Sequence, residues 1–490
     1  MKKLLSLLAF AGMLFVVSCS DDDEAALPTL TAPSSATTGL GMSGTAVFSY
    51  TAESGVASVD AVGTGVTIDG TDGDQSATSG DITVSYTVDA LGTNSIVLTL
   101  TDNNGTSVDA TAIIETSDFT TTEVTENITE DVTWEAGVYI LNGRIAVEAG
   151  ATLTIEAGTI IKGAPGELAD ASVLLVARGA TLNAMGTADA PIVFTAEIDP
   201  IQPFETISTT DPTVENLWGG VIINGNAPIS AQNDNDQDVT ELQIEGIPTT
   251  DTNGLYGGSD AADNSGTITY ISIRHGGTEL GSGNEINGLT LGGVGSGTTI
   301  SHVEIVANQD DGIEWFGGNV DIDNVVIWNA GDDGLDTDQD WVGTCTNFVI
   351  VTPDGSAFEL DGPEGSQDRT PAHQFDGGVV FAGADIDHLI DWDGSTDAGV
   401  SNVYFFGLEA DYVVTADFEP IESFGGDGAG TTESWEVTLA AGTTLEGVFG
   451  ASGAAITEEV SEGNKTVGPA ASDFDWSWAG ASGALSGLGF

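Results

Sequence analysis

Short runs of alternating apolar and polar residues recur through the first quarter of the chain. Residues 46–50 and 82–88 are two such runs, and Gly and Asp residues separate them from their neighbours. Alternation with a period of two places every second side chain on one face of a strand. Short strands at intervals of about ten residues are typical of an antiparallel sandwich. The pattern predicts an immunoglobulin-like β-sandwich over residues 28–116, and no residue in it suggests chemistry.

A second pattern begins beyond residue 131, where related segments return at a fixed interval. Five predicted strands share one template of apolar and polar positions, and their ranges are 268–273, 300–305, 322–327, 345–350 and 400–405. A repeat of roughly 22 residues with Gly and Asn at the corners predicts a solenoid, and the leucine spacing of a leucine-rich repeat is absent. We therefore expect a parallel β-helix over residues 132–410. A linker at 117–131 precedes it, and last coils with a C-terminal cap follow at 411–490.

The template also assigns roles to small and polar residues that recur in it. Cys345 takes the inward position that Ile300 and Ile322 hold in earlier coils, so we expect a small buried hydrophobe rather than a reactive thiol. Stacked side chains at a corner can satisfy backbone groups that bend out of a sheet. We interpret one recurring corner position as such a structural ladder, and its members are His302, Asn324, Asn347 and Asn402.

Carboxylates repeat with the same interval. The segment Asp-Asp-Gly-Ile-Glu at 310–314 returns as Asp-Asp-Gly-Leu-Asp at 332–336. In a β-helix, residues one coil apart are separated by about 4.8 Å. The sequence therefore predicts two stacked columns of acids, with Asp391 as a further candidate. The first column consists of Asp311, Asp333 and Asp354, and the second consists of Glu314, Asp336 and Glu359.

Like charges at this spacing repel by roughly 1 kcal/mol per pair in water, so something must relieve the repulsion. Three interpretations remain open. On an open face, solvent and salt would screen the charges. Alternatively, the six acids of the two columns would bind Ca²⁺, which takes oxygen ligands. The third interpretation is a raised pKa on one member of each pair, which is the arrangement that acid/base catalysis uses.

The catalytic alternative is a polysaccharide hydrolase or lyase whose acids would be Asp311, Glu314, Asp333 and Asp336. Their spacing superficially resembles polygalacturonase-type β-helix hydrolases, in which paired carboxylates protonate the leaving group and activate water. The Gly-His-Gly and Arg-x-Lys segments of that family are missing here. For Arg274 and Arg369 we expect structural pairing. We therefore assign no catalytic residue and keep the enzyme as an alternative.

Tryptophans accompany the acidic columns. An exposed aromatic face can stack on a sugar ring, whereas buried packing is the commoner fate of tryptophan. Both interpretations are open for the candidate ligand-binding residues, which are Trp315, Trp341 and Trp392.

The N-terminal residues have the form of a targeting segment. Two lysines precede an apolar run at residues 4–17 that is too short to span a bilayer. The Val-Val-Ser-Cys at its end resembles the lipobox of bacterial lipoproteins, which implies a signal peptide at residues 1–18 and lipidation of Cys19. The acidic tether at 19–27 resembles the tag that directs lipoproteins of Bacteroidota to the outer face of the outer membrane. We therefore expect a membrane partner through a lipid at Cys19.

The charge balance is strongly acidic, with 76 acidic and 8 basic residues and a formal net charge of −68. A surface of this sign repels nucleic acid and anionic lipid, so we expect no nucleic-acid partner. Adaptation to salty water explains a dense carboxylate surface without any specific function. With Cys19 lipidated, Cys345 is the remaining cysteine, which excludes an intramolecular disulfide.

Residues from about 132 to 490 resemble an uncharacterised family of secreted right-handed parallel β-helix lipoproteins that is common in Bacteroidota. The phrases that carry the resemblance are GATLTIEAGTIIKG, GTADAPIVFT, LWGGVIINGNAPI, GLYGGSDAADNSGTITYISIRHGG and FDWSWAG. The resemblance implies a right-handed coil and no particular reaction. We predict a cell-surface outer-membrane lipoprotein with a non-catalytic binding module for a glycan or a divalent cation such as Ca²⁺. A polysaccharide-active enzyme and a structural or adhesion protein are the alternatives.

Overall fold

The computed structural model describes eight stretches of the chain, which are 26–73, 76–117, 119–233, 235–281, 285–384, 386–393, 395–408 and 432–490. The expected signal peptide, Cys19 and most of the acidic tether lie outside them. The chain divides into two compact units, Met1–Asp118 and Phe119–Phe490. None of the helices in the described stretches is long and apolar enough to cross a membrane.

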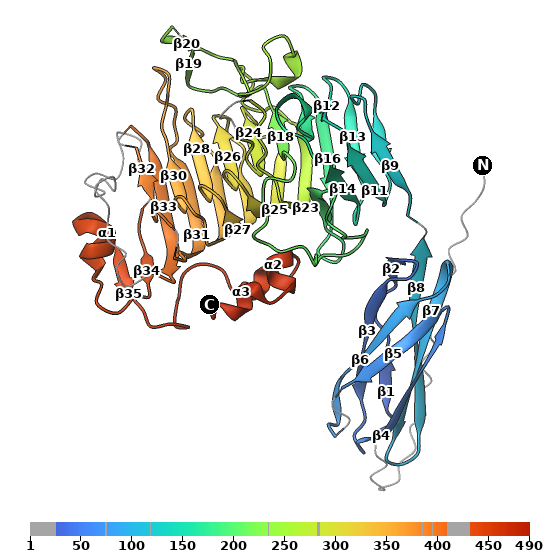
Figure 1. The fold of residues 1–490 in the computed structure, drawn as a ribbon. Coiled ribbons are helices and arrows are strands. Elements are labelled where there is room, and N and C mark those ends of the chain that lie inside the picture. Colours follow the sequence, from blue (N-terminus) through green and yellow to red (C-terminus); the bar gives the residue numbers. More distant parts are fainter. Residues whose placement is uncertain are drawn as a thin grey trace. The chain divides into compact units, whose positions relative to one another are not determined.

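The first unit is a sandwich of two four-stranded sheets (Figure 1). One sheet has the order β1 (Thr29–Thr31), β3 (Ser43–Thr51), β6 (Ser79–Val88) and β5 (Val66–Asp72), and the other has β2 (Ala36–Gly39), β8 (Ser107–Ser117), β7 (Gly92–Asp102) and β4 (Val56–Thr64). Alternate side chains such as Phe48, Val84 and Leu98 are buried between the sheets. The predicted immunoglobulin-like sandwich is therefore confirmed.

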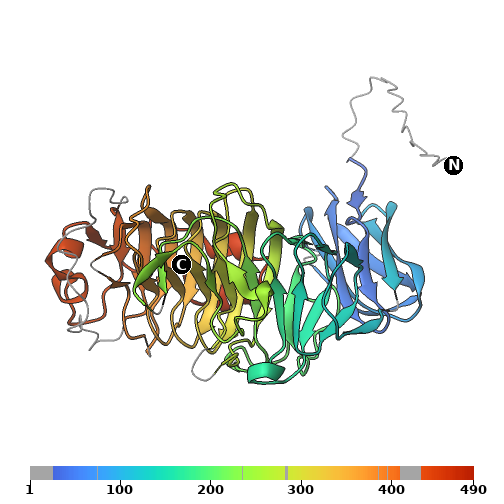
Figure 2. The ribbon, with the colours of Figure 1, turned by 90° about the horizontal axis from the view of Figure 1, so that it is seen from above.

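The second unit is a parallel β-helix in which one long sheet runs through every coil (Figures 1 and 2). Its strands, in spatial order, are β9 (Thr121–Val124), β11 (Val138–Leu141), β14 (Ile160–Gly163), β17 (Ile192–Ala196), β23 (Gly266–Arg274), β25 (Thr299–Asn308), β27 (Ile322–Ala330), β29 (Thr344–Val351), β31 (His373–Phe381), β33 (Ala398–Phe406), β34 (Trp435–Val437) and β35 (Thr457–Glu459). Ile300, Ile322 and Cys345 lie in register and are buried, as expected. Burial raises the pKa of the Cys345 thiol well above its usual value.

A second parallel sheet of the β-helix carries the acidic columns. Its strands, in spatial order, are β12 (Arg144–Val147), β15 (Val173–Val176), β18 (Val221–Asn224), β24 (Leu289–Gly292), β26 (Ile313–Phe316), β28 (Leu335–Asp338), β30 (Phe358–Leu360) and β32 (Asp391–Trp392). An insertion with β19 (Ala231–Asn233), β20 (Gln237–Val239), β21 (Leu242–Gln243), η2 (Thr252–Gly254) and β22 (Leu255–Tyr256) packs on the outer face of its early strands.

The corner ladder has a backbone cause. In the early coils, one strand ends before the corner and another begins after it. The strands before the corner are β10 (Val132–Trp134), β13 (Thr152–Ile155) and β16 (Thr181–Met185). In the next coil a single strand, β23, spans the corner: it pairs with β16 before a bend at Tyr270 and with β17 after the bend. The φ angles at this corner are 55° for His302 and 58° for Asn324 and Asn347, in the left-handed region that asparagine tolerates better than most residues. The Asn347 amide donates to Asn324 Oδ1. The ladder is structural, although these amides bond to other side chains rather than to bent backbone.

The linker predicted at 117–131 is wrong, because this segment forms part of the first coil. The strand β9 pairs with β11 in parallel, and Ile128 is buried in the core of the β-helix. Thr121, Thr122 and Glu123 are exposed. Their polar character reflects an exposed face of the first coil, and it mimics the composition of a linker.

The terminal aromatic stretch covers a side of the β-helix rather than its open end. The end is covered by α1 (Leu445–Ala454), whose Phe449 lies 5.4 Å from Phe405 between ring centroids. The segments η3 (Ala471–Phe474), α2 (Trp478–Ala481) and α3 (Ala484–Gly487) instead pack on the outer face of the long sheet, where Val349, Val379 and Tyr404 form an apolar surface. Within the range 411–490 in which a C-terminal cap was predicted, α1 therefore covers the end of the β-helix, and the terminal aromatic segment covers an apolar side.

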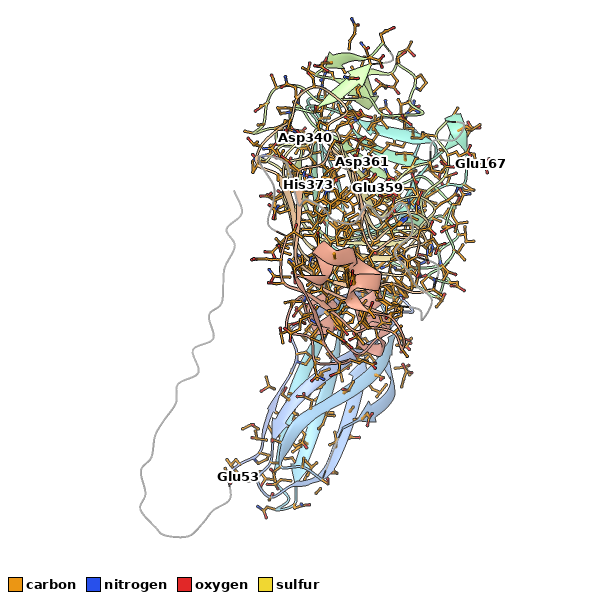
Figure 3. All side chains as sticks on the ribbon, turned by 90° about the vertical axis from the view of Figure 1, so that its left-hand side faces the viewer. Glu53, Glu167, Asp340, Glu359, Asp361 and His373 are labelled. Atoms are coloured by element: carbon orange, nitrogen blue, oxygen red, sulfur yellow. The ribbon has the colours of Figure 1, made fainter. Side chains whose placement is uncertain are left out.

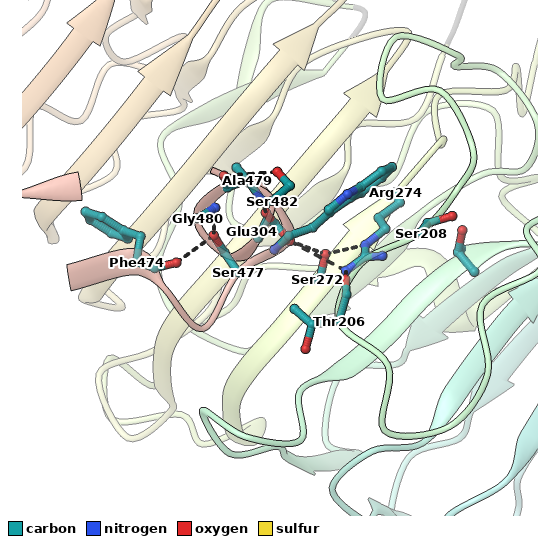
Figure 4. Close-up of polar contacts among 12 residues, drawn as sticks. Thr206, Ser208, Ser272, Arg274, Glu304, Phe474, Ser477, Ala479, Gly480 and Ser482 are labelled. Atoms are coloured by element: carbon teal, nitrogen blue, oxygen red, sulfur yellow. Dashed lines mark hydrogen bonds and ion pairs between the residues drawn. The ribbon is translucent and has the colours of Figure 1, made fainter. Parts of the chain in front are cut away.

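The start of α2 is held by the buried carboxylate of Glu304 on β25 (Figure 4). Glu304 accepts hydrogen bonds from the backbone N–H groups of Trp478 and Ala479 at 3.0 and 2.8 Å. The guanidinium of Arg274 lies 3.8 Å from Glu304 and 4.7 Å from the centroid of the Trp478 ring. Arg369 donates to the carbonyl oxygen of Asp340 at 2.8 Å. Both arginines therefore have structural partners.

Candidate functional site: an acidic cleft on the second sheet

One acidic column follows the strands of the second sheet. Glu314 on β26 lies beside Asp336 on β28, Asp336 beside Glu359 on β30, and Glu359 beside Asp391 on β32. These residues point outward because their neighbours Ile313, Leu335 and Phe358 fill the core. The strand register thus brings together the three acids that the repeat pattern placed in this column and the further candidate Asp391.

A second column lies in the turns that precede the strands. Asp311 Oδ1 accepts the backbone N–H of Asp333 at 3.0 Å, and Asp333 Oδ1 accepts the backbone N–H of Ser356. Ser356 therefore takes the next place, and the expected Asp354 is exposed and lies outside the column. The 21-residue spacing was misleading because the coil from Asp333 to its structural equivalent contains 23 residues.

The residue after Ser356 in this column is His388, which pairs with Ser356 in a parallel bridge. Sequence spacing missed this placement because the intervening coil is longer than its predecessors. The interval of 32 residues between Ser356 and His388 does not match the repeat of 22 or 23. A search that allowed loops between coils could have found it.

Each Asp-Asp-Gly turn needs its glycine for close packing between coils. A Cβ on Gly312 would lie 2.5 Å from the carbonyl oxygen of Gly334, and one on Gly334 would lie 2.8 Å from the carbonyl oxygen of Ala357. Asn308 adds a further constraint, because its amide donates to the carbonyl oxygens of Ile286 and Asp311. These contacts fix the turns that present the acids.

The acids open into a cleft of about 370 Å³. Eight acids from the turns, the strands and neighbouring loops line it, and they are Glu245, Glu285, Asp310, Asp311, Glu314, Asp332, Asp338 and Glu359. The lining also includes apolar side chains, and we call Ile244 of the insertion, Leu280 and Phe316 the apolar wall. No lysine, arginine or histidine is among the described residues that line the cleft.

Two groups of three acids are close enough to hold a metal ion, and all their members except Asp336 line the cleft. In each group, one carboxylate oxygen per residue lies within 4.8 Å of the others, and the groups are Asp310, Asp311 and Asp332, and Asp311, Glu314 and Asp336. Asn287 lines the same cleft, and its amide nitrogen contacts Glu314 Oε2. Its Oδ1 atom is buried and accepts no hydrogen bond.

A comparison with models of protein families shows to which family this β-helix belongs. The model of the pectate-lyase like beta helix domain matches residues 126–376, about half of the chain. The chain belongs to this β-helix family. Comparisons with curated proteins and with solved structures gave no match. The family supports a carbohydrate-related role, whereas the narrower resemblance to secreted lipoproteins of Bacteroidota stays a prediction.

Burial and mutual repulsion raise the pKa values of several acids of this β-helix domain. Burial, followed by the charge of Asp332, raises the pKa of Asp310 to about 7. A hydrogen bond with Asp333, followed by burial, raises the pKa of Glu359 to about 9. Burial is also the main reason why the pKa values of Asp311, Glu314 and Asp336 lie well above the usual range. Figure 3 marks Glu359 among the side chains of the β-helix.

The described basic residues lie elsewhere in the β-helix. His373 is buried, lies 3.3 Å from Thr337 Oγ1, and has a pKa lowered to about 4 by burial. Arg369 bonds with Asp340 outside the cleft. None of the described side chains that line the cleft is cationic, in contrast to the buried Glu304, which lies beside Arg274.

The tryptophans predicted to bind a ligand do not line the cleft. Trp315 and Trp341 are fully buried in the core, with ring centroids 4.6 Å apart, and Trp392 is half-buried, with its indole N–H 3.4 Å from the carbonyl oxygen of Thr396. Strand alternation explains this, because Glu314 and Phe316 point outward and Trp315 between them points inward. Phe316 is the aromatic residue that lines the cleft, and the same alternation could have identified it.

Proposed function

We propose that this member of the β-helix family is a non-catalytic binding module that holds a divalent cation, Ca²⁺, in the acidic cleft and contacts a carbohydrate there. The observation that carries the proposal is the cleft itself, with eight acids and no described basic side chain on its walls. At about 4.8 Å, two like charges repel by roughly 3 kcal/mol at an effective dielectric constant of 20. A bound cation relieves this repulsion.

The donor atoms fit calcium. Ca²⁺ takes about six to eight oxygen ligands from carboxylates, amide carbonyls and water. The group of Asp311, Glu314 and Asp336 supplies three carboxylates, and Asn287 Oδ1 is a buried carbonyl oxygen without a hydrogen-bond partner. Sulfur and imidazole ligands, which zinc prefers, do not occur among the residues described on the cleft walls.

The apolar wall fits a carbohydrate. A sugar ring has an apolar C–H face and a hydroxylated edge, and aromatic and aliphatic side chains bind the apolar face. Leu280 and Phe316 would contact that face while the cation binds hydroxyl or carboxylate oxygens. The proposal extends to location: a lipid on Cys19 would hold the module at the cell surface, and residues 1–24 support this by their sequence.

A thermal melt in chelator and in Ca²⁺ tests the cation. Wild-type protein should melt at a higher temperature with millimolar Ca²⁺, because a ligand at about 100 times its Kd stabilises the folded state by roughly 2.7 kcal/mol. Asp336→Asn should show a clearly smaller shift, whereas the exposed Asp189→Asn, which lies in an early coil, should retain the full shift. Equal melting temperatures for wild type with Ca²⁺ and with chelator would overturn the proposal.

A glycan array tests the carbohydrate. Binding to an array of neutral and acidic polysaccharides should appear with Ca²⁺ and disappear with chelator. Phe316→Ala should reduce glycan binding while leaving the Ca²⁺-dependent melting shift intact. Loss of the shift in this variant would mean that Phe316 supports the fold rather than the ligand.

An enzyme is the second candidate, because glycoside hydrolysis needs one protonated and one ionised carboxyl group. The pKa of about 8 at Asp338 and of about 9 at Glu359 would supply acids that stay protonated at neutral pH. Among the residues that the structure describes, His388 is a basic residue in line with the column of Asp311 and Asp333, two coils beyond Asp333. Release of new reducing ends or unsaturated sugars from a bound polysaccharide, lost in Glu359→Gln, would favour the enzyme over the binding module.

A further inference from the structure

The five acids that could hold a metal ion do not form one group around one point. They form two groups of three, in which the carboxylate oxygens lie within 4.8 Å of one another, and Asp311 belongs to both. Ca²⁺ binds oxygen at about 2.3–2.6 Å, so oxygens that share one ion lie at most about 5 Å apart. Each group meets this limit separately. One ion therefore serves one group and leaves two acids of the other group without a cation.

Charge leads to the same conclusion. The five acids carry up to five negative charges when ionised, so one divalent cation leaves three charges uncompensated and two cations leave one. Asp311 and Asp336 are 7% and 8% exposed, and water and salt screen buried charges less than charges on an open surface, so residual repulsion between these acids is more costly. A second cation is therefore the simplest way for all five acids to ionise together.

A separate observation points to a ligand at this place. Asn287 is 5% exposed, and its amide nitrogen contacts Glu314 and Thr290, so the amide group is directed into the cleft. Its Oδ1 atom is buried without a hydrogen-bond partner. A buried acceptor without a hydrogen bond lowers the stability of the folded protein by roughly 1–3 kcal/mol. A bound cation would use this oxygen and remove the cost.

We infer that the cleft holds two divalent cations side by side and that the Asp311 carboxylate bridges them. Asp310 and Asp332 complete one site, and Glu314 and Asp336 complete the other. Cations in paired sites of proteins lie about 3.5–4 Å apart. This inference rests on the proposed function and specifies the ligand: two adjacent oxygens of a sugar, such as vicinal hydroxyls, can bind one cation each at the open side of the cleft.

Titration calorimetry of the chelator-treated protein with CaCl₂ tests the pair. Wild type should bind two ions, and Asp310→Asn and Asp336→Asn should each bind one. Asp311→Asn should weaken both sites at least tenfold, because it removes the shared charge. Its amide oxygen can still accept the backbone N–H of Asp333, so the turn should fold, and circular dichroism checks this. Asp189→Asn is the matched control and should bind two ions.

The outcomes separate this inference from the proposed function. One ion bound by wild type would overturn the pair and leave the single-cation module standing. No binding by wild type would overturn both. Two ions in wild type with only one lost in Asp311→Asn would overturn the bridging role of Asp311. Two ions in wild type, one in each outer variant and both weakened in Asp311→Asn would support the pair.

Discussion

Replacement of Asp338 by asparagine tests the electrostatics of the cleft. Burial, followed by the charge of Glu364, raises the pKa of Asp338 from 3.8 to about 8. In the unfolded chain this carboxyl group ionises near pH 4, whereas the folded protein retains its proton until about pH 8. Because the folded state binds more protons in this window, the free energy of unfolding falls as pH rises through it.

The magnitude follows from the two pKa values. Each pH unit between 3.8 and the working pH lowers the free energy of unfolding by about 1.4 kcal/mol, which gives about 4 kcal/mol at pH 7. Screening by water and ions reduces this value, so we expect Asp338→Asn to gain roughly 1–3 kcal/mol at pH 7. The new amide oxygen can replace Asp338 Oδ1, which accepts the backbone N–H of Gln339 at 2.6 Å.

Urea unfolding followed by tryptophan fluorescence, in chelator at pH 5 and pH 8, measures the effect. Asp338→Asn should unfold at a higher urea concentration than wild type at pH 8, and its advantage should shrink to less than half at pH 5. Asp189→Asn should follow wild type at both pH values. A variant that is less stable than wild type at pH 8, or whose advantage does not depend on pH, would refute the electrostatic reasoning.

Three further variants or reactions test the framework around the cleft. Glu304→Ala leaves Arg274 buried without its ion pair and should cost about 3–5 kcal/mol in urea unfolding, with faster proteolysis of residues 471–490; unchanged proteolysis would contradict the anchoring role. Asn347→Ala puts an ordinary residue at a φ of 58° and should lower stability by about 1–2 kcal/mol, whereas Asn347→Gly should change it by less. Cys345 should resist iodoacetamide in native buffer and react in urea, because its thiol is fully buried; rapid native labelling would show that the core opens.

The repeat pattern predicted the parts of the fold that depend on strand register. The inward place of Cys345 and the column from Glu314 to Glu359 both follow from coil length and side-chain alternation. Asp354 was misplaced because the coil that begins at Asp333 contains 23 residues rather than 21. Of the two interpretations left open for Trp315, buried packing holds, because strand alternation points its side chain inward.

Other features depend on contacts between distant segments and left no signal in the repeat. The apolar wall of the cleft combines Ile244 of the insertion with Leu280 and Phe316. The composition of residues 119–131 reflects an exposed face, so it could not distinguish a first coil from a linker. The position of the terminal helices on a side of the β-helix could not be predicted, because the apolar outer face on which they pack forms only when the coils are stacked.

The anchoring of α2 on Glu304 has a consequence for the order of folding. Each coil contacts its immediate neighbours and can add to the stack as soon as it has been synthesised. The hydrogen bonds from Trp478 and Ala479 join residues 174 and 175 positions apart, so they must wait until most of the domain exists. Until then, Arg274 and the apolar side of the long sheet stay open to water and to other chains. Before α2 docks, association between incompletely folded molecules therefore competes with folding.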